Sequence, residues 1–207
     1  MTMKEKYAIY GIKKIGYLDI ETSGLTADFD IMLSWANLIR DINTEKTSTT
    51  YDVVKKSDFE LAYNKKNADI IDKRITETLI DDIAKCDLLI GHWFIGKHRH
   101  DIPFIRTRCA INKVSGFPHH RKVRYGDTQK WGSLLYRLHS NGLESIADMF
   151  DVSTKKTRLE PRTWKNACIG VKESLDYIVD HNIKDCKLTW QIHKGMENFV
   201  PIPATYC

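Results

Sequence analysis

The chain has 207 residues and a mass of 24.0 kDa, and its 42% hydrophobic and 29% charged residues are typical of a globular protein. Its net charge of +5 permits a polyanionic partner without requiring one. The N-terminal segment lacks a signal-peptide core and no apolar run reaches membrane-spanning length, so the sequence predicts a cytoplasmic protein with no membrane partner. Five cysteines without CxxC spacing argue against a disulfide framework or a zinc site.

The first part of the chain has the composition and alternation of β-strands. We predict strands over residues 14–20, 31–42 and 47–54. A helical period follows over residues 68–85, and residues 88–91 form a short apolar strand.

The second part of the chain is mainly helical. We predict a helix over residues 101–113, a strand over 122–128, and helical structure over 129–198 with a polar, basic interruption at 153–165. Strands followed by alternating helices and strands predict an α/β fold with a mixed sheet flanked by helices. No linker divides this pattern, so residues 1–207 are expected to form a single domain.

Two carboxylates lie at the end of the first predicted strand. Because side chains alternate along a strand, Asp19 and Glu21 share one face of the sheet. Two acids side by side in a half-buried place repel each other, and a bridging Mg²⁺, which prefers oxygen ligands, removes that cost. The pair therefore indicates half of a metal site.

A third acid, Asp101, begins the helix predicted after the short apolar strand. The simpler interpretation is a helix N-cap with Pro103 in the first turn. The insert before it, residues 96–100, is basic and contains His98 and His100. These two histidines suggest a metal-binding pair, but a solvated basic loop near phosphate is favoured because no third ligand supports a zinc site.

The C-terminal helical region contains His181 and Asp185, which lie on one helix face because four positions separate them. A surface His–Asp pair of little energetic consequence is the alternative.

A basic segment precedes that helix. Its cations, Lys155, Lys156 and Arg158 among them, together with Trp164 suit backbone phosphates and one stacked base. A solvated loop with Trp164 in the core is the alternative.

Three of these stretches, in this order, resemble the motifs of the DnaQ-like (DEDD) 3′–5′ exonucleases of the RNase H-like superfamily. The matching stretches are Asp19-Ile20-Glu21-Thr22-Ser23-Gly24-Leu25, His100-Asp101-Ile102-Pro103-Phe104-Ile105 and His181-Asn182-Ile183-Lys184-Asp185. The resemblance extends over residues 15–192. Two departures stand out: Trp93 replaces the family's usual Asn, and His181 has the spacing of the family's Tyr subgroup.

The resemblance implies an RNase H-like mixed sheet that begins with a three-stranded meander. It also implies two Mg²⁺ or Mn²⁺ ions about 3.5–4 Å apart, with His181 as the general base. Asp127 would be structural, supporting a strand end. The implied metal ligands are Asp19, Glu21, Asp101 and Asp185; the expected substrate contacts are Thr22, Ser23, Gly24, Leu25, Trp93, Lys155, Lys156 and Arg158.

The activity implied by the resemblance is 3′–5′ hydrolysis of nucleic acid, with single-stranded DNA favoured, to nucleoside 5′-monophosphates. The expected partners are a nucleic acid with a free 3′ end and a separate polymerase or replication protein. The alternatives are an RNA-directed exonuclease, a non-catalytic binding or polymerase accessory subunit on the same fold, and an α/β domain of unrelated function.

Overall fold

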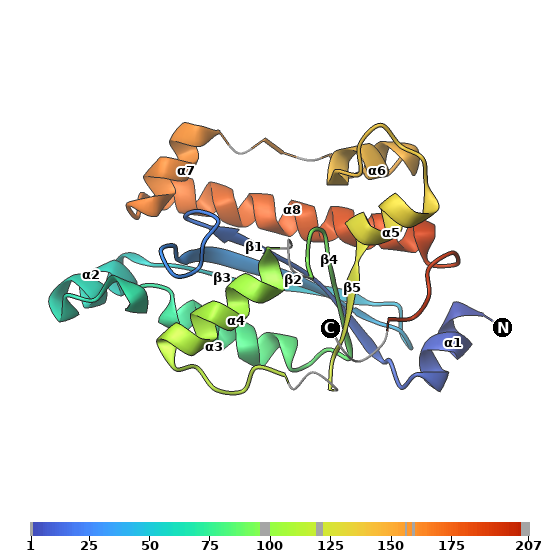
Figure 1. The fold of residues 1–207 in the computed structure, drawn as a ribbon, viewed down its shortest axis with the longest axis horizontal. Helices are drawn as coiled ribbons and strands as arrows, with labels where there is room; N and C mark the ends of the chain where they lie inside the picture. The colour runs from blue at the N-terminus through green and yellow to red at the C-terminus, as the bar shows by residue number, and fades with distance from the viewer. Residues whose placement is uncertain (1, 96–99, 119–121, 156, 159, 204–207) are drawn as a thin grey trace.

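A mixed sheet forms the centre of the molecule. The computed structural model describes residues 2–95, 100–118, 122–155, 157–158 and 160–203. Within these residues the strands are β1 (Lys14–Thr22), β2 (Met32–Asp41), β3 (Thr47–Val53), β4 (Leu88–Gly91) and β5 (Arg124–Asp127). They form a five-stranded sheet in the order β3-β2-β1-β4-β5 (Figure 1).

The central strand, β1, joins two kinds of pairing. It pairs antiparallel with β2, which pairs antiparallel with β3, and it pairs parallel with β4, which pairs parallel with β5. The register between β1 and β2 shifts between Glu21 and Thr22, at the carboxyl end of β1. The predicted mixed sheet, with its three-stranded antiparallel start, is confirmed.

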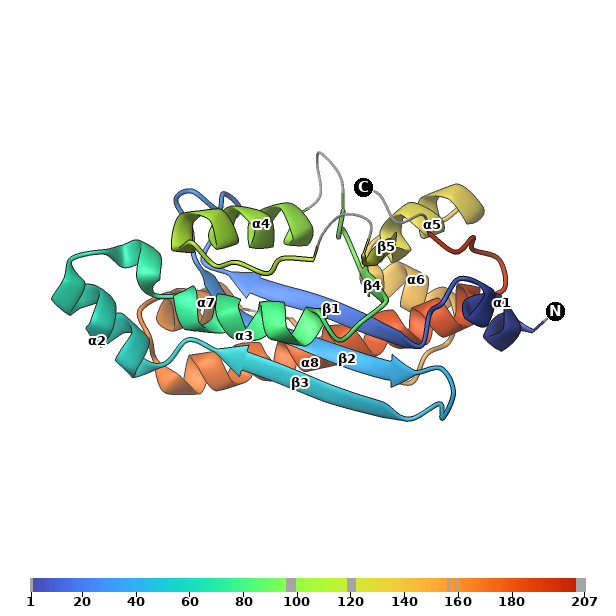
Figure 2. The same cartoon turned by 90° about the horizontal axis from the view of Figure 1, so that it is seen from below.

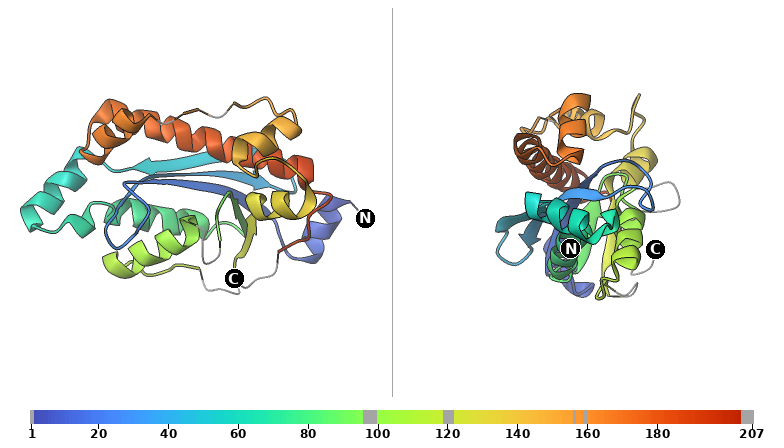
Figure 3. Two further views of the ribbon diagram at one scale, coloured as in Figure 1. Left: turned by 45° about the horizontal axis from the view of Figure 1, so that its top comes forward. Right: turned by 90° about the vertical axis from the view of Figure 1, so that its left-hand side faces the viewer.

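Helices cover both faces of the sheet, as predicted. They are α1 (Met3–Ile9), α2 (Lys56–Lys65), the 3₁₀ helix η1 (Ala68–Ile70), α3 (Lys73–Ile83), α4 (Asp101–Asn112), α5 (Thr128–Leu135), α6 (Leu143–Met149), α7 (Pro161–Cys168) and α8 (Lys172–Met196). The long helix α8 crosses one face, whereas α3 and α4 lie on the other (Figures 2 and 3). The shorter helices α6 and α7 pack beside α8.

The alternation of β1 decides which side chains face α8. Tyr17 belongs to the buried cluster that contains Leu188 and Ile192 of α8, whereas Leu18 belongs to the cluster that contains Ile75 and Leu79 of α3. Odd-numbered residues of β1 therefore point towards α8. The acids at positions 19 and 21 share that direction.

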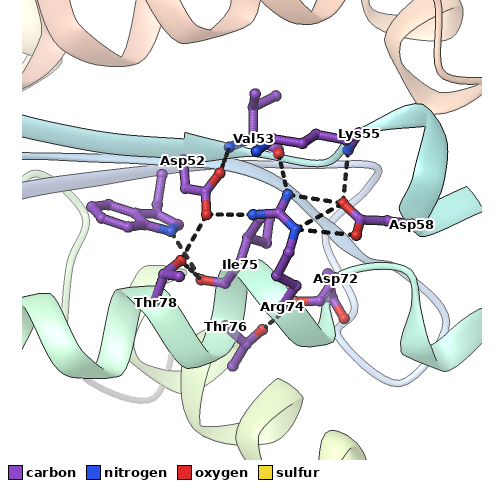
Figure 4. Close-up of polar contacts among 10 residues, drawn as sticks. Asp52, Val53, Lys55, Asp58, Asp72, Arg74, Ile75, Thr76 and Thr78 are labelled. Atoms are coloured by element: carbon purple, nitrogen blue, oxygen red, sulfur yellow. Dashed lines mark hydrogen bonds and ion pairs between the residues drawn. The ribbon is translucent and has the colours of Figure 1, made fainter.

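A cationic side chain joins α3 to the end of β3 and to α2. The Arg74 guanidinium donates to Asp52 Oδ2 at 2.6 Å, to the Val53 carbonyl at 2.7 Å and to Asp58 Oδ2 at 2.8 Å (Figure 4). This planar group can donate in several directions at once. The network fixes the point where the chain leaves the sheet for α2.

Several predicted element boundaries were wrong. The predicted helix over residues 68–85 is divided into η1 and α3, and α7 begins inside the predicted interruption at 153–165. The helices α1 and α2 were not predicted. Each buries too little to produce an apolar period: α1 buries Tyr7, and α2 buries Asp58 and Ala62.

Candidate active site

The carboxyl end of β1 and the middle of α8 bring together four of the predicted site residues. Asp19 and Glu21 lie within β1, which runs two residues beyond the predicted strand end. His181 and Asp185 lie one turn apart on α8. His181 Nε2 is 3.5 Å from Glu21 Oε1 and 3.8 Å from Asp185 Oδ2.

The pKa of Asp19 is affected by the charges of the other acids. Burial raises the pKa of Asp19 well above its usual value, and the negative charge of Asp185 raises it further. Asp101 and Glu21 act on it in the same direction. A carboxylate influenced by three others is one that a cation stabilises strongly.

The fourth acid, Asp101, is the first residue of α4 and is only 5% exposed. Burial raises its pKa to about 6, against the opposing effect of His100, whose Nδ1 lies 3.3 Å from Asp101 Oδ1. The other oxygen, Oδ2, is buried and has no hydrogen-bond partner within the described residues. A buried carboxylate oxygen of this kind requires a donor or a cation.

The chemistry of these donors fits a divalent cation. The four acids offer only hard oxygen ligands, which suit Mg²⁺ or Mn²⁺. In the described part of the chain, no three His, Cys, Asp or Glu side chains already form a group that could hold an ion.

Sequence reasoning missed three polar residues that contact the site. Asn182 Nδ2 donates to Asp19 Oδ2 at 2.5 Å, and Asn182 Oδ1 accepts a hydrogen bond from the Ser34 hydroxyl. Thr157 Oγ1 lies 2.6 Å from His181 Nδ1. The only signal in the sequence was the position of Asn182 beside His181 on the same helix.

The loop after β1 is braced internally. The Ser23 hydroxyl donates to Asp30 Oδ1 at 3.1 Å and accepts from the Ile31 amide at 3.0 Å. A Cβ on Gly24 would lie 2.5 Å from Asp30 Oδ1, so only glycine fits there without a shift. Leu25 remains 80% exposed at the surface of the loop. Within this loop, Leu25 is thus the predicted contact most available to a substrate.

Beside the acids lies a hollow of about 610 Å³, whose lining includes Glu21, His181, Thr157, Arg158 and Trp164. A larger hollow of about 740 Å³ lies along α2 and η1 and contains none of the predicted site residues. The hollow beside the acids is therefore the better candidate for substrate.

The structure describes some of the other predicted substrate contacts but not all of them. Trp93 is 45% exposed and has a left-handed backbone conformation, with φ of 59°. Lys155 and Arg158 are exposed, whereas Lys156, like His98 of the basic insert, lies outside the described residues.

Asp127 has the structural role expected for it. Its Oδ1 accepts from the amides of Gln129 and Lys130 at the start of α5, and its Oδ2 accepts from the amides of Phe94 and Ile95. These contacts cap a helix and fix the loop that follows β4.

The strand order and the acids at the end of the central strand define an α/β protein of the RNase H-like fold. A family model of the RNase H superfamily matches residues 16–197, and the chain belongs to this superfamily. Its members commonly hydrolyse phosphodiester bonds, generally with divalent metal ions, and the fold implies a nucleic acid substrate.

A comparison with curated proteins found no match. None of the helices in the described residues combines the length and the apolar character needed to cross a lipid bilayer.

Proposed function

We propose that this protein is a metal-dependent 3′–5′ exonuclease of the DnaQ-like group, which releases nucleoside 5′-monophosphates and favours single-stranded DNA. The observation that carries the proposal is the grouping of acids from β1, α4 and α8 around Asp19, with His181 within 4 Å of two carboxylates. Acids from three segments distant in sequence thus act on one another electrostatically, which supports a shared site.

The proposed metal ligands are Asp19, Glu21, Asp101 and Asp185. Two bound Mg²⁺ or Mn²⁺ ions would supply Lewis-acid stabilisation of the charge that develops on the cleaved phosphate. His181 removes a proton from the attacking water, since an imidazole can accept one near neutral pH. Attack at phosphorus breaks the bond to the 3′ oxygen of the preceding nucleotide, which then forms the new 3′ end.

The proposed substrate contacts come from the loop after β1, from the segment after β4 and from the basic segment before α7. Leu25, exposed on the loop after β1, is proposed to lie against the terminal base, and the exposed Trp93 is proposed to contact the strand. Lys155, Lys156 and Arg158 are proposed to contact phosphates, in the segment beside the hollow. The proposal that a separate polymerase is a partner rests on the family resemblance alone.

One experiment tests the proposal. A 5′-labelled single-stranded DNA and an RNA of the same sequence are incubated with the protein in Mg²⁺, Mn²⁺ or EDTA. We expect a ladder that shortens from the 3′ end, faster on DNA, and no cleavage in EDTA.

The variant Asp185→Asn should abolish cleavage because it removes a proposed ligand. The matched control is Asp180→Asn, the same substitution at an exposed position of α8, which should retain activity. Cutting of a covalently closed single-stranded circle, activity in EDTA or an active Asp185→Asn enzyme would each contradict the proposal. Faster degradation of the RNA would replace DNA by RNA as the substrate.

A further inference from the structure

A buried chain of hydrogen bonds runs from β2 through α8 to the first acid of the site. The Ser34 hydroxyl donates to Asn182 Oδ1, and Asn182 Nδ2 donates to Asp19 Oδ2 at 2.5 Å. Ser34 and Asn182 are both 0% exposed. We propose that Asn182 is a positioning residue that holds Asp19 for metal binding and that Ser34 holds the oxygen end of the Asn182 amide in place. The inference rests on the proposed function.

The direction of the amide follows from its carboxylate neighbour. A carboxylate accepts hydrogen bonds, so the Asn182 atom nearest Asp19 must be the nitrogen. The Asn182 oxygen then faces Ser34, whose hydroxyl can donate to it. The Ser34 hydroxyl could also accept from an amide nitrogen, so the acceptor-only carboxylate of Asp19 decides which end of the amide faces it.

An amide suits this position because it is neutral. A lysine or arginine would also hold the Asp19 carboxylate, but its positive charge would repel the cation that the acids are proposed to bind. Asn182 occupies only Oδ2 of Asp19 and leaves Oδ1 as a ligand. Groups that orient metal ligands in this way typically contribute about 10–100-fold to metal affinity or activity.

A second contact between α8 and β2 provides a matched control. The Cys186 thiol, one turn after Asn182, donates to the Ala36 carbonyl at 3.1 Å and is also 0% exposed. This contact helps to dock the same helix on the same strand but makes no hydrogen bond to Asp19. A variant of Cys186 therefore separates the effect of helix docking from the effect on the carboxylate.

The test compares Asn182→Ala, Asn182→Asp, Ser34→Ala and Cys186→Ala in the full chain. Mn²⁺ affinity is measured by titration calorimetry without substrate, and kcat and KM are measured on the labelled single strand. We expect Mn²⁺ to bind about 10–100-fold more weakly to Asn182→Ala, with kcat reduced and KM for the strand little changed. Ser34→Ala should show a smaller loss, and Cys186→Ala should bind Mn²⁺ like the wild type.

The Asn182→Asp variant keeps the side-chain shape but, when ionised, cannot donate to Asp19 and repels it, so turnover at pH 8 should stay as low as in Asn182→Ala. Mn²⁺ affinity in both Asn182 variants within about threefold of wild type would overturn the inference, as would an equal loss in Cys186→Ala. If Asn182→Ala fails to fold, the Mn²⁺ affinities of Ser34→Ala and Cys186→Ala are compared instead. Weaker binding in Ser34→Ala alone supports the inference, and equal affinities overturn it. If the wild-type protein binds Mn²⁺ with an affinity that depends on Asn182 but degrades no strand, the proposed function is refuted and the positioning role stands.

Discussion

At the scale of single residues, His181 lies between a hydroxyl and two carboxylates. Thr157 Oγ1 is 2.6 Å from Nδ1, whereas Nε2 faces Glu21 at 3.5 Å. If Nδ1 carries the ring proton, its N–H donates a hydrogen bond to Thr157 Oγ1. Nε2, the nitrogen that faces the acids, then has a free lone pair. Thr157 would then hold the ring in the tautomer that a general base needs, because its hydroxyl can accept from Nδ1.

We predict that Thr157→Val, which removes the hydroxyl but keeps the shape, lowers kcat by up to about tenfold, the size of one hydrogen bond. Thr157→Ser should retain most of the activity. His181→Ala should lose on the order of 10²–10⁴-fold in turnover, and adding Thr157→Val to it should cause no further loss. The four variants are compared by their single-turnover rates at saturating Mg²⁺. Additive losses in the double variant would show that Thr157 does not act through His181.

The sequence could predict the acids of the candidate site but not the groups that hold them. Asp19 and Glu21 follow from the period of a strand, and the pair on α8 follows from the period of a helix. Ser34 and Thr157 reach the site from other segments, and nothing in their local sequence indicates a tertiary contact. Such contacts depend on how β2 and the segment before α7 pack, which spacing alone does not determine.

At the scale of the elements, a buried ion pair anchors the middle of the loop after β1 and the start of β2. Arg108 of α4 and Asp72 before α3 are each 0% exposed, with Nε 2.8 Å from Oδ2. The guanidinium also donates to the Ala27 carbonyl, and the carboxylate accepts from the Met32 amide. The exposed Leu25 is therefore carried by a loop whose backbone is anchored in the core.

We predict that Arg108→Met lowers the free energy of unfolding by about 3–5 kcal/mol, because it leaves Asp72 as a buried charge without its partner. The control is Arg106→Met, on the exposed side of the same helix, where the guanidinium lies over the Phe117 and Tyr125 rings; it should cost about 1 kcal/mol, clearly less than the buried pair. Urea unfolding of the three proteins gives the comparison. Equal losses in the two variants would show that the buried pair has no special role.

The strands were more predictable than the helices for a physical reason. Strands β1 and β2 bury most of their residues, so their apolar and β-branched patterns were visible in the sequence. The helix α2 is fixed by polar contacts such as that between Arg74 and Asp58, which leave no periodic signal. Hydrophobic periodicity predicts the elements that build the core and misses those attached to it by hydrogen bonds.

At the scale of the whole molecule, α8 links the candidate site to a second buried cluster. Near its end, His193 is 1% exposed, lies 2.8 Å from the Tyr17 hydroxyl through Nδ1, and stacks on Trp131. Burial, and then the positive charge of Arg40, lowers the pKa of His193 to about 3. The folded protein therefore keeps this imidazole neutral at pH values where the unfolded chain protonates it.

We predict that this histidine makes the protein sensitive to acid. Stability is unaffected above the unfolded pKa of about 6.5 and falls as the pH drops from there towards 3, with a loss of roughly 2 kcal/mol at pH 5. His193→Gln should be less stable than the wild type at pH 7.5, but the gap should narrow by about that amount at pH 5. Urea midpoints at the two pH values test this, and a constant gap would contradict it.

The same unfolding curves bear on the expected single domain of residues 1–207. If the chain forms one domain, circular dichroism and tryptophan fluorescence should give coincident transitions. Two separated transitions would contradict that expectation.

The position of α8 in the chain has a consequence for synthesis. A ribosome makes the strand that bears Asp19 long before the helix that bears Asp185, and the two meet only when residues 172–196 have emerged and packed on the sheet. Under the proposed function, a nascent or prematurely terminated chain would lack two of its five catalytic side chains. The nuclease would then be inactive on nearby messenger RNA or DNA until residues 172–196 have been made and have packed on the sheet.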